Sequence, residues 1–335
     1  MSRPTIVWPG TGRITLVLLA VVPAVIAYPW QSTRDRWLLG IAAAVVILLF
    51  GWWQGLHFTT ILRRRLAMQR RNRRPVRRSG ADVPTTALLH IAPPATGPDV
   101  LPLPLIAGYL DRYGIRADAI RITSRDSASD TGAPRRETWV GLTLSAVDNL
   151  AALRARSPRI PLHETAKVAV RRLADHLREL GWEANPAGPD DVPQLFAPTA
   201  RETWREVREG SADYVAAYRV SADADLPYTL AAIQSHPARE TWTAMEIGGA
   251  GARRTLAAAC AFRTDAPPHG APPGLTPQRG NHKSALMALH PLSAQRLDGH
   301  AGLPDGLLER LHWPSAPAAA VPARSRPRHA AATRT

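Results

Sequence analysis

Two uninterrupted apolar segments lie near the start of the 335-residue chain, at residues 14–30 and 37–56. Neither contains a charged residue, and a helix needs about 20 apolar residues, with a lower limit of about 17, to cross a membrane. The first segment contains Pro23 and Pro29, whereas the second is of full length. The pattern predicts two transmembrane helices joined by the turn 31–36. A cleaved signal peptide is disfavoured, because the second segment follows almost at once and no small-residue cleavage site precedes the turn.

Beyond residue 82 the pattern changes to short β-like runs that alternate with helical periodicity, which is typical of an α/β domain. The clearest helix is His163–Leu180, whose apolar residues recur at three- and four-residue steps before the C-cap Gly181. We expect a mixed sheet covered by helices. The other expected strands are Thr85–Ile91, Ala119–Thr123, Thr138–Leu144, Tyr214–Val220, Thr241–Ile247 and Leu256–Phe262, and the other expected helices are Pro104–Tyr113, Val147–Arg156, Pro227–His236 and Ser284–Leu289.

These patterns divide the chain into five parts. The last part is rich in Pro, Ala and Arg with almost no large apolar residues, so we expect it to be disordered. A breaker-rich stretch, Ala184–Pro198, is expected to be a loop within the domain. The parts are a short cytoplasmic N-terminus 1–13, a transmembrane hairpin 14–56, a basic juxtamembrane segment 57–81, a cytoplasmic α/β domain 82–313 and a tail 314–335.

The formal net charge of +15 is concentrated outside the expected domain. Residues 1–81 contain thirteen arginines and a single acid, Asp35, and the tail 314–335 adds four arginines and no acid. Residues 82–313 contain 25 basic and 26 acidic residues, so the domain is nearly neutral. A strongly basic chain would suggest nucleic acid as a partner, but the excess charge of this chain lies at the expected membrane boundary and in the tail. We therefore expect no nucleic-acid partner.

Nine arginines without an intervening acid follow the second apolar segment: Arg63, Arg64, Arg65, Arg70, Arg71, Arg73, Arg74, Arg77 and Arg78. Basic residues beside a membrane span stay on the cytoplasmic side and are attracted to anionic headgroups. The turn 31–36 has only two arginines and one Asp. The run therefore predicts a plasma-membrane protein with both its N-terminus and its main domain in the cytoplasm. We expect Phe58–Arg74 to form a basic helix on the membrane surface, with the arginines binding anionic lipid or an acidic partner; a solvated charge run is the simpler alternative.

The second apolar segment also contains a cluster of small residues. Small side chains allow two helices to approach closely in lipid. The residues that we expect to pack against a neighbouring span are Gly40, Ala42, Ala43 and Ala44.

Motifs for chemistry are weak. Cys260, the single cysteine, lies in an apolar run and is expected to be a buried hydrophobe. Gly248–Thr255 resembles a phosphate loop but lacks the Gly-Lys-Ser/Thr step and joins two expected strands, which favours a hairpin turn. Asp223 and Asp225 have the Asp-x-Asp spacing with which sugar-nucleotide transferases hold a divalent metal, but the start of a helix explains them more simply. We predict no catalytic residue, metal site or cofactor, and keep a membrane-tethered sugar-nucleotide transferase as the alternative.

The tetrapeptide Arg-Glu-Thr-Trp occurs three times, ending at Trp139, Trp204 and Trp242. The spacings are irregular, so the copies do not mark a solenoid repeat. A shared binding surface is one interpretation, but we favour packing anchors, because two copies lead directly into expected strands.

Several dispersed stretches together carry a resemblance to a known family: Gly108–Gly114, Arg121–Asp126, Val147–Leu153, Ile160–Leu162, Arg172–Glu179, Glu240–Trp242, Gly274–Pro277, Pro291–Ser293 and Arg296–Gly299. With the apolar hairpin and the arginine run that precede them, these stretches resemble the EccE family, a membrane component of type VII (ESX) secretion. The resemblance covers residues 14–300, and its nearest branch is the one tied to metal acquisition in mycobacteria and their relatives. It implies a structural, non-enzymatic subunit of an inner-membrane complex with two N-terminal spans, an α/β cytoplasmic domain and the partners EccB, the ATPase EccC and EccD.

Overall fold

The structure is a computed structural model that describes residues 21–22, 25–26, 33, 36–37, 39–41, 43, 52–53, 56–73, 84–94, 100–127, 135–157, 161–249, 251–268 and 270–313. It divides into two compact units, residues 1–77 and 78–335, and each is described by itself. The second unit contains the predicted α/β domain.

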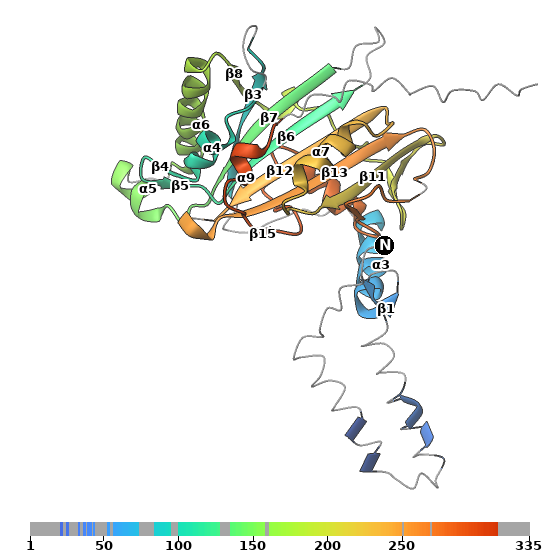
Figure 1. Cartoon of the computed structure of the whole chain (residues 1–335). Helices are drawn as coiled ribbons and strands as arrows, with labels where there is room; N and C mark the ends of the chain where they lie inside the picture. Colours follow the sequence, from blue (N-terminus) through green and yellow to red (C-terminus); the bar gives the residue numbers. More distant parts are fainter. Residues whose placement is uncertain are drawn as a thin grey trace, which may run out of the picture. The chain divides into compact units, whose positions relative to one another are not determined.

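An eleven-stranded sheet runs through the second unit (Figure 1). The order along it is β8-β3-β7-β6-β12-β13-β11-β10-β9, with β14 beside β11 and β15 beside β13. The long strands are β3 (Thr85–Ala92), β6 (Ala119–Ser127), β7 (Arg135–Leu144), β11 (Asp213–Val220), β12 (Glu240–Gly248) and β13 (Thr255–Thr264). The short strands are β8 (Glu183–Ala187), β9 (Arg201–Glu202), β10 (Val207–Glu209), β14 (Leu275–Pro277) and β15 (Ala301–Gly302).

Each pairing between described strands of this sheet is antiparallel, whereas we expected a mixed sheet. Strands that run in the same direction do occur, but they are not neighbours. The connection from β3 to β6 passes through a helix, and β7 then inserts between these two parallel strands. The helical crossover that suggests parallel pairing therefore produces an antiparallel ladder.

The same strand order occurs twice in this sheet. In chain order β3, β6, β7 and β8 lie as β8-β3-β7-β6, and β11, β12, β13 and β14 lie as β14-β11-β13-β12. In each half a helix, α4 (Leu103–Ala107) or α7 (Leu226–Gln234), connects the first two strands. This is the order of the split β-α-β arrangement of ferredoxin-like folds. The halves join where β6 pairs with β12 from Ala119 opposite Gly248 to Ser127 opposite Glu240.

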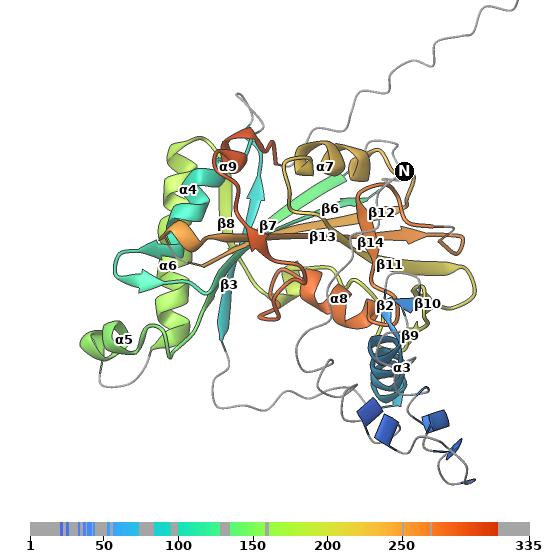
Figure 2. The same ribbon diagram turned by 60° about the horizontal axis from the view of Figure 1, so that its bottom comes forward.

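Helices cover both faces of the sheet (Figure 2). One face carries α4, α6 (Leu162–Glu179), α7 and α9 (Leu307–Arg310), and the other carries α8 (His282–Leu289). Successive residues of a strand point to opposite faces. In β7, Val140 and Leu142 accordingly join the first core while Trp139 joins the second. Burial on both sides explains why these strands read as continuous apolar runs.

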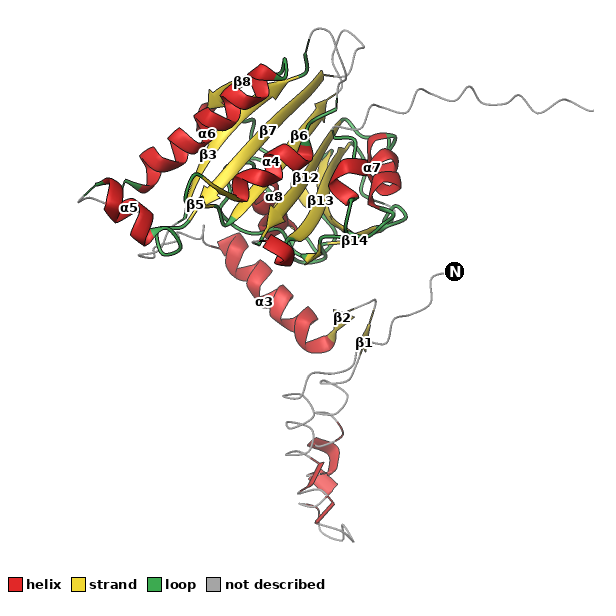
Figure 3. Ribbon diagram, turned by 60° about the vertical axis from the view of Figure 1, so that its left-hand side comes forward, coloured by secondary structure: helices red, strands yellow, loops and turns green. Residues whose placement is uncertain are grey.

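The helix α6 confirms the clearest prediction from periodicity. It crosses β3, β8 and β7 (Figure 3) and buries Ala166, Val170, Leu173, Ala174 and Leu177. Gly181 follows its end with a φ of 87°. The Gly181 N–H donates to the carbonyl of Arg178 (2.9 Å) and the Trp182 N–H to that of Leu177 (3.0 Å), which closes the helix as expected of a C-terminal glycine.

Two expected elements differ. The helix expected at Pro104–Tyr113 ends at Ala107, continues as a 3₁₀ turn, η1 (Gly108–Leu110), and gives way to a hairpin of β4 (Asp111–Arg112) and β5 (Ile115–Arg116). The expected loop Ala184–Pro198 begins with β8, in which Pro186 is tolerated because β8 is an edge strand. The remaining expected strands and helices are present with shifted ends, including α5 (Leu150–Arg156).

The first unit contains α3 (Phe58–Arg73), which confirms the predicted basic helix up to Arg73. Before it, β1 (Trp52–Trp53) pairs antiparallel with β2 (Leu56–His57), so the end of the expected second span is not helical. Two glycines in this sequence disfavour a helix, and Trp favours a strand. Thr33 and Arg36, expected in a turn, are helical.

Among the described residues, the structure contains no helix with both the length and the apolar character needed to cross a bilayer. Most of the two predicted spans, the N-terminal segment 1–13 and the tail 314–335 lie outside the described residues.

Candidate functional site

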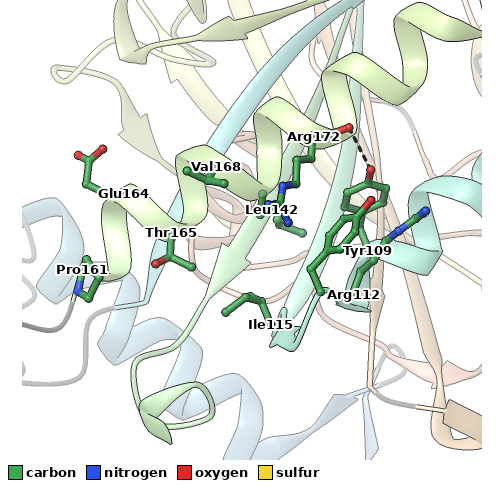
Figure 4. Close-up of a pocket in the computed structure, with 11 residues that line it drawn as sticks. Tyr109, Arg112, Ile115, Leu142, Pro161, Glu164, Thr165, Val168 and Arg172 are labelled. Carbon is green, nitrogen blue, oxygen red and sulfur yellow. Dashed lines mark hydrogen bonds between the residues drawn. The ribbon is translucent and has the colours of Figure 1, made fainter. Parts of the chain in front are cut away.

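A pocket of about 180 Å³ lies between α6 and the β4–β5 hairpin (Figure 4). Its volume is close to that of a cavity of about 150 Å³ that admits a benzene ring, so it suits one side-chain-sized group. Leu142 of β7 is among its lining residues. Its other apolar lining includes Ile115, Pro161, Val168 and Ala169, and its polar lining includes Tyr109, Arg112, Tyr113, Glu164 and Arg172.

The hairpin beside the pocket depends on its two turn residues. Tyr113 and Gly114 both have positive φ values, 57° and 70°. Two consecutive residues of this kind form the type I′ turn, whose twist matches that of the strands it joins. Glycine adopts this conformation freely, whereas a tyrosine rarely does. Tyr113 therefore occupies a strained position, and its ring is half exposed beside the pocket.

Asn149 holds the other end of the hairpin. Its side-chain oxygen accepts from the Arg116 N–H (2.8 Å), and its side-chain nitrogen donates to the Arg116 carbonyl (2.7 Å) and to that of Ser145 (2.9 Å). The residue is buried. This pairing imitates a strand neighbour and ties the start of α5 to the hairpin.

Tyr109 connects the hairpin to α6. Its hydroxyl donates to the carbonyl of Arg172 (3.0 Å) and lies 3.4 Å from Nδ1 of His176. Burial raises the pKa of the Tyr109 phenol above its ordinary value of 10.0, although Arg112 opposes the shift. The phenol therefore stays neutral and serves as a hydrogen-bond donor rather than as a base.

Two guanidinium groups lie over the tyrosine rings at the pocket. The central carbon of Arg112 is 4.8 Å from the ring centre of Tyr109 and 5.3 Å from that of Tyr113. That of Arg172 is 4.5 Å from the ring centre of Tyr113. Cation–π contacts of this kind are worth about 0.5–1 kcal/mol at exposed sites. They orient both cations without neutralising them, so the pocket is suited to bind an anion.

Asp223 and Asp225, the expected alternative metal site, lie at the start of α7. The Asp225 N–H donates to a carboxylate oxygen of Asp223 (3.0 Å), and Asp225 occupies the N-cap position of the helix. Both residues are exposed. Among the residues that the structure describes, no group of three His, Cys, Asp or Glu is placed to hold a metal ion. The turn that precedes a helix accounts for both residues.

The arginine run is partly described. Its first four members, Arg63, Arg64, Arg65 and Arg70, lie on α3, as do the backbones of Arg71 and Arg73. Leu62 and Leu66, two apolar residues of this helix, are 57% and 51% exposed. The remaining arginines, Arg74, Arg77 and Arg78, lie outside the described residues.

The small residues of the second span are also partly described. Gly40 and Ala43 are helical and exposed, and a Cβ built on Gly40 meets no atom within 4 Å. Ala42 and Ala44 lie outside the described residues.

Two copies of the Arg-Glu-Thr-Trp motif meet in the second core. Trp139 and Trp242 stack with ring centroids 5.8 Å apart and planes 12° apart. Arg125 of the intervening β6 pairs with Glu137 (3.0 Å) and with Glu240. These two copies are packing anchors, as predicted. In the other copy Glu202 is buried and accepts from the Lys283 N–H (3.2 Å).

Arg121, Glu246 and His300 form a buried polar cluster that was not predicted from the sequence. Nε of Arg121 donates to Glu246 (3.0 Å), and Nε2 of His300 donates to the other carboxylate oxygen (3.0 Å). Burial alone would raise the pKa of Glu246, but the hydrogen bonds from His300 and Arg121 outweigh it, so the pKa is lowered. Nothing in the local sequence links these three residues, because β6, β12 and the segment that precedes β15 supply one each.

The predictions for Cys260 and for the glycine-rich segment Gly248–Thr255 are confirmed. Cys260 is fully buried, and burial raises the pKa of its thiol. Gly248 ends β12 and Thr255 begins β13, its antiparallel partner, so the glycine-rich segment is a hairpin connection. The buried charged residues described above thus form internal ion pairs, and the pocket beside α6 is the candidate site.

Comparison with known proteins adds relatives over almost the whole chain. Residues 133–220, which include the α6 side of the pocket, match the model of the family EccE, a type VII ESX secretion system translocon. The chain is 62% identical over 318 residues to the ESX-3 secretion system protein EccE3 of Mycobacterium tuberculosis, covering 93% of this chain and 95% of that protein. It is 49% identical over 293 residues to the ESX-3 secretion system protein EccE3 of Mycolicibacterium smegmatis, covering 87% and 91%.

Proposed function

Because this chain belongs to the EccE family and is a component of the type VII (ESX) secretion system, we propose that it is a non-enzymatic structural subunit that assembles and stabilises the membrane complex. The family expected from the sequence is confirmed, and the relatives bear the name ESX-3. The observation that carries the proposal is this relationship, which extends over both the apolar N-terminal region and the domain.

The domain has the properties of a scaffold. Two of its buried carboxylates, Glu246 and Glu240, pair with Arg121 and with Arg263 (2.8 Å), respectively. Its large antiparallel sheet is covered on both faces. A domain with a well-packed core of this kind supports a role in holding other subunits.

The proposed topology is a hairpin of two spans, about 14–30 and 37–56, in the plasma membrane. The N-terminus 1–13, the juxtamembrane segment 57–81, the domain 82–313 and a disordered tail 314–335 lie in the cytoplasm. The charge asymmetry across the spans supports this orientation, because the arginine run follows the second span while the turn between the spans is nearly neutral. The exposed Leu62 and Leu66 on the basic helix α3 are suited to contact the membrane surface.

The proposed partners are EccB, the ATPase EccC, EccD and anionic lipids. In the membrane, Gly40, Ala42, Ala43 and Ala44 would permit close approach of a neighbouring span. On the cytoplasmic side, the arginine run would bind lipid headgroups or an acidic face of a partner.

The test is affinity purification of the full chain, tagged at its C-terminus, from membranes in a mild detergent. We expect an ATPase and a many-span membrane protein of the secretion system to be recovered with it. A matched preparation from cells that express an untagged chain measures background. Recovery of the tagged chain alone, in a folded state and at normal abundance, would contradict the structural role.

A further inference from the structure

The charges of the pocket beside α6 are not balanced within the chain. Among the described residues, no carboxylate pairs with the guanidinium of Arg112 or Arg172, and both instead lie over tyrosine rings. Arginines in the sheet differ, since Arg121, Arg125 and Arg263 each pair with at least one carboxylate. Glu164, the acid of the pocket lining, pairs with Lys167 (3.4 Å). The pocket therefore retains two oriented cations beside an apolar cavity.

We propose that this pocket is a docking site for a peptide segment of another subunit of the secretion complex. The segment would place one apolar side chain in the cavity and a neighbouring Asp or Glu against Arg112 and Arg172. The proposal rests on the proposed function, because it takes the occupant from the same complex.

The lining favours a peptide over a phosphate or a lipid headgroup. Ile115, Leu142 and Val168 present apolar surface, and the volume of about 180 Å³ suits one side chain. Glu164 also lines the cavity and would repel a multiply charged phosphate. A single carboxylate carries less charge than a phosphate and is repelled less by Glu164, while the planar guanidinium groups can still hold it with two parallel hydrogen bonds.

The geometry also favours a preformed site. Tyr109 and Tyr113 hold the two guanidinium groups in place, so less side-chain freedom is lost when a carboxylate binds. Tyr113 and Val168 are 52% and 44% exposed, which leaves apolar surface around the cavity accessible. Aromatic and arginine side chains of this kind are enriched where partners bind most tightly.

The two ends of this chain are poor candidates for the occupant. The tail 314–335 contains no acidic residue, and residues 1–81 contain only Asp35. The complementary charge is therefore best supplied by a second protein.

The experiment places the photo-crosslinking residue benzoylphenylalanine at Val168 in the full tagged chain and irradiates cells that contain the complex. We expect a covalent adduct with another subunit, and mass spectrometry should map it to a peptide with Asp or Glu near the crosslinked residue. Adding Arg112→Gln and Arg172→Gln should lower adduct yield by about tenfold or more, because a charge-assisted hydrogen bond is lost at each position. Arg171→Gln with Arg178→Gln removes the same charge from α6 outside the pocket lining and should leave the yield unchanged.

Adducts to lipid, or to a peptide without an acid, would overturn the proposal, as would an equal effect of the control pair. Absence of an adduct while other subunits are still recovered with the tagged chain would overturn the docking site and leave the proposed function standing. Failure to recover any subunit would overturn both. If thermal unfolding shows that the double Gln variant does not fold, the peptide crosslinked at position 168 in the otherwise unchanged chain tests the proposal by itself.

Discussion

Arg121 and Glu246 lie 125 residues apart in the sequence and form an ion pair whose side chains are 4% and 0% exposed. They are directly opposite each other in the β6–β12 pairing, where the two halves of the sheet join. Arg121 also donates to the carbonyls of His290 (3.2 Å), Ser293 (2.6 Å) and Gln295 (2.5 Å). One arginine thus fastens the junction of the halves to the segment that follows α8.

Replacing Glu246 by Ala should destabilise the full chain strongly. The change leaves the Arg121 guanidinium buried without its carboxylate, which costs about 3–5 kcal/mol. Urea unfolding of the detergent-solubilised protein measures the loss. The control is Asp175→Ala, which breaks an exposed pair with Arg178 (2.7 Å) and should cost less than about 1 kcal/mol. Similar losses for the two variants would contradict the importance of the buried pair.

Stability should fall as the pH decreases below 6.5. Burial and the nearby Arg121 lower the pKa of His290 in the folded protein, so the unfolded chain binds more protons in the window just below 6.5. The contribution of the neutral ring is therefore present above pH 6.5 and is lost as the pH falls toward the folded pKa. Melting temperatures measured between pH 7.5 and pH 5 test this.

The control for the pH experiment is His290→Asn. Asn does not titrate, and its side-chain oxygen can still accept from the Leu292 N–H, as Nδ1 of His290 does (3.3 Å). The variant should show a flatter dependence. Because burial also lowers the pKa of His236, adding His236→Gln should flatten it further. An unchanged slope in both variants would contradict the assignment.

Replacing Gly114 by Ala should destabilise the β4–β5 hairpin by about 1–2 kcal/mol. No atom lies within 4 Å of a Cβ built at Gly114, so the cost comes from its φ of 70° alone. Tyr113→Asn should be tolerated, because Asn adopts positive φ more readily in this turn. Thermal unfolding compares the two. A larger loss for Tyr113→Asn would mean that the contacts of the Tyr113 ring with Arg112 and Arg172 outweigh the backbone strain.

Replacing Arg63, Arg64, Arg65 and Arg70 by Gln should weaken attachment of the basic segment to anionic membranes. Each arginine near such a surface is worth about 1 kcal/mol. We would measure two quantities: the binding of the purified complex that contains the full chain to vesicles with and without anionic lipid, and the amount of that complex recovered. Unchanged values in both would contradict a lipid or partner contact.

Orientation reporters at positions 33 and 90 should report the outside and the cytoplasm, respectively.

The transferase alternative makes a separate prediction. If Asp223 and Asp225 only form the turn before α7, a sugar nucleotide with Mn²⁺ should not raise the melting temperature of the full chain. A shift that disappears in Asp225→Ala would instead support metal-dependent nucleotide binding. Asp190→Ala, at an exposed turn, is the matched control.

Local patterns determined a large part of this domain. The three- and four-residue steps of His163–Leu180 predicted α6, because a helix on a sheet must bury one stripe. The long strands were predicted from runs that are buried on both faces. The sorting of charge along the chain also identified the domain as nearly neutral. These are properties of neighbouring residues, so the sequence expresses them directly.

Only the tertiary structure decided the rest. The expected helix Pro104–Tyr113 ends early, and Tyr113 lies in a left-handed turn instead. The reason is that packing of the hairpin beside α6 outweighs the local preference for a helix. The twice-repeated strand order left no readable trace in the sequence, since strand pairing depends on backbone hydrogen bonds rather than on side-chain identity. Arg112 and Arg172 likewise became one site only when the hairpin and α6 were placed side by side. Residues distant in sequence share a function only after the chain has folded.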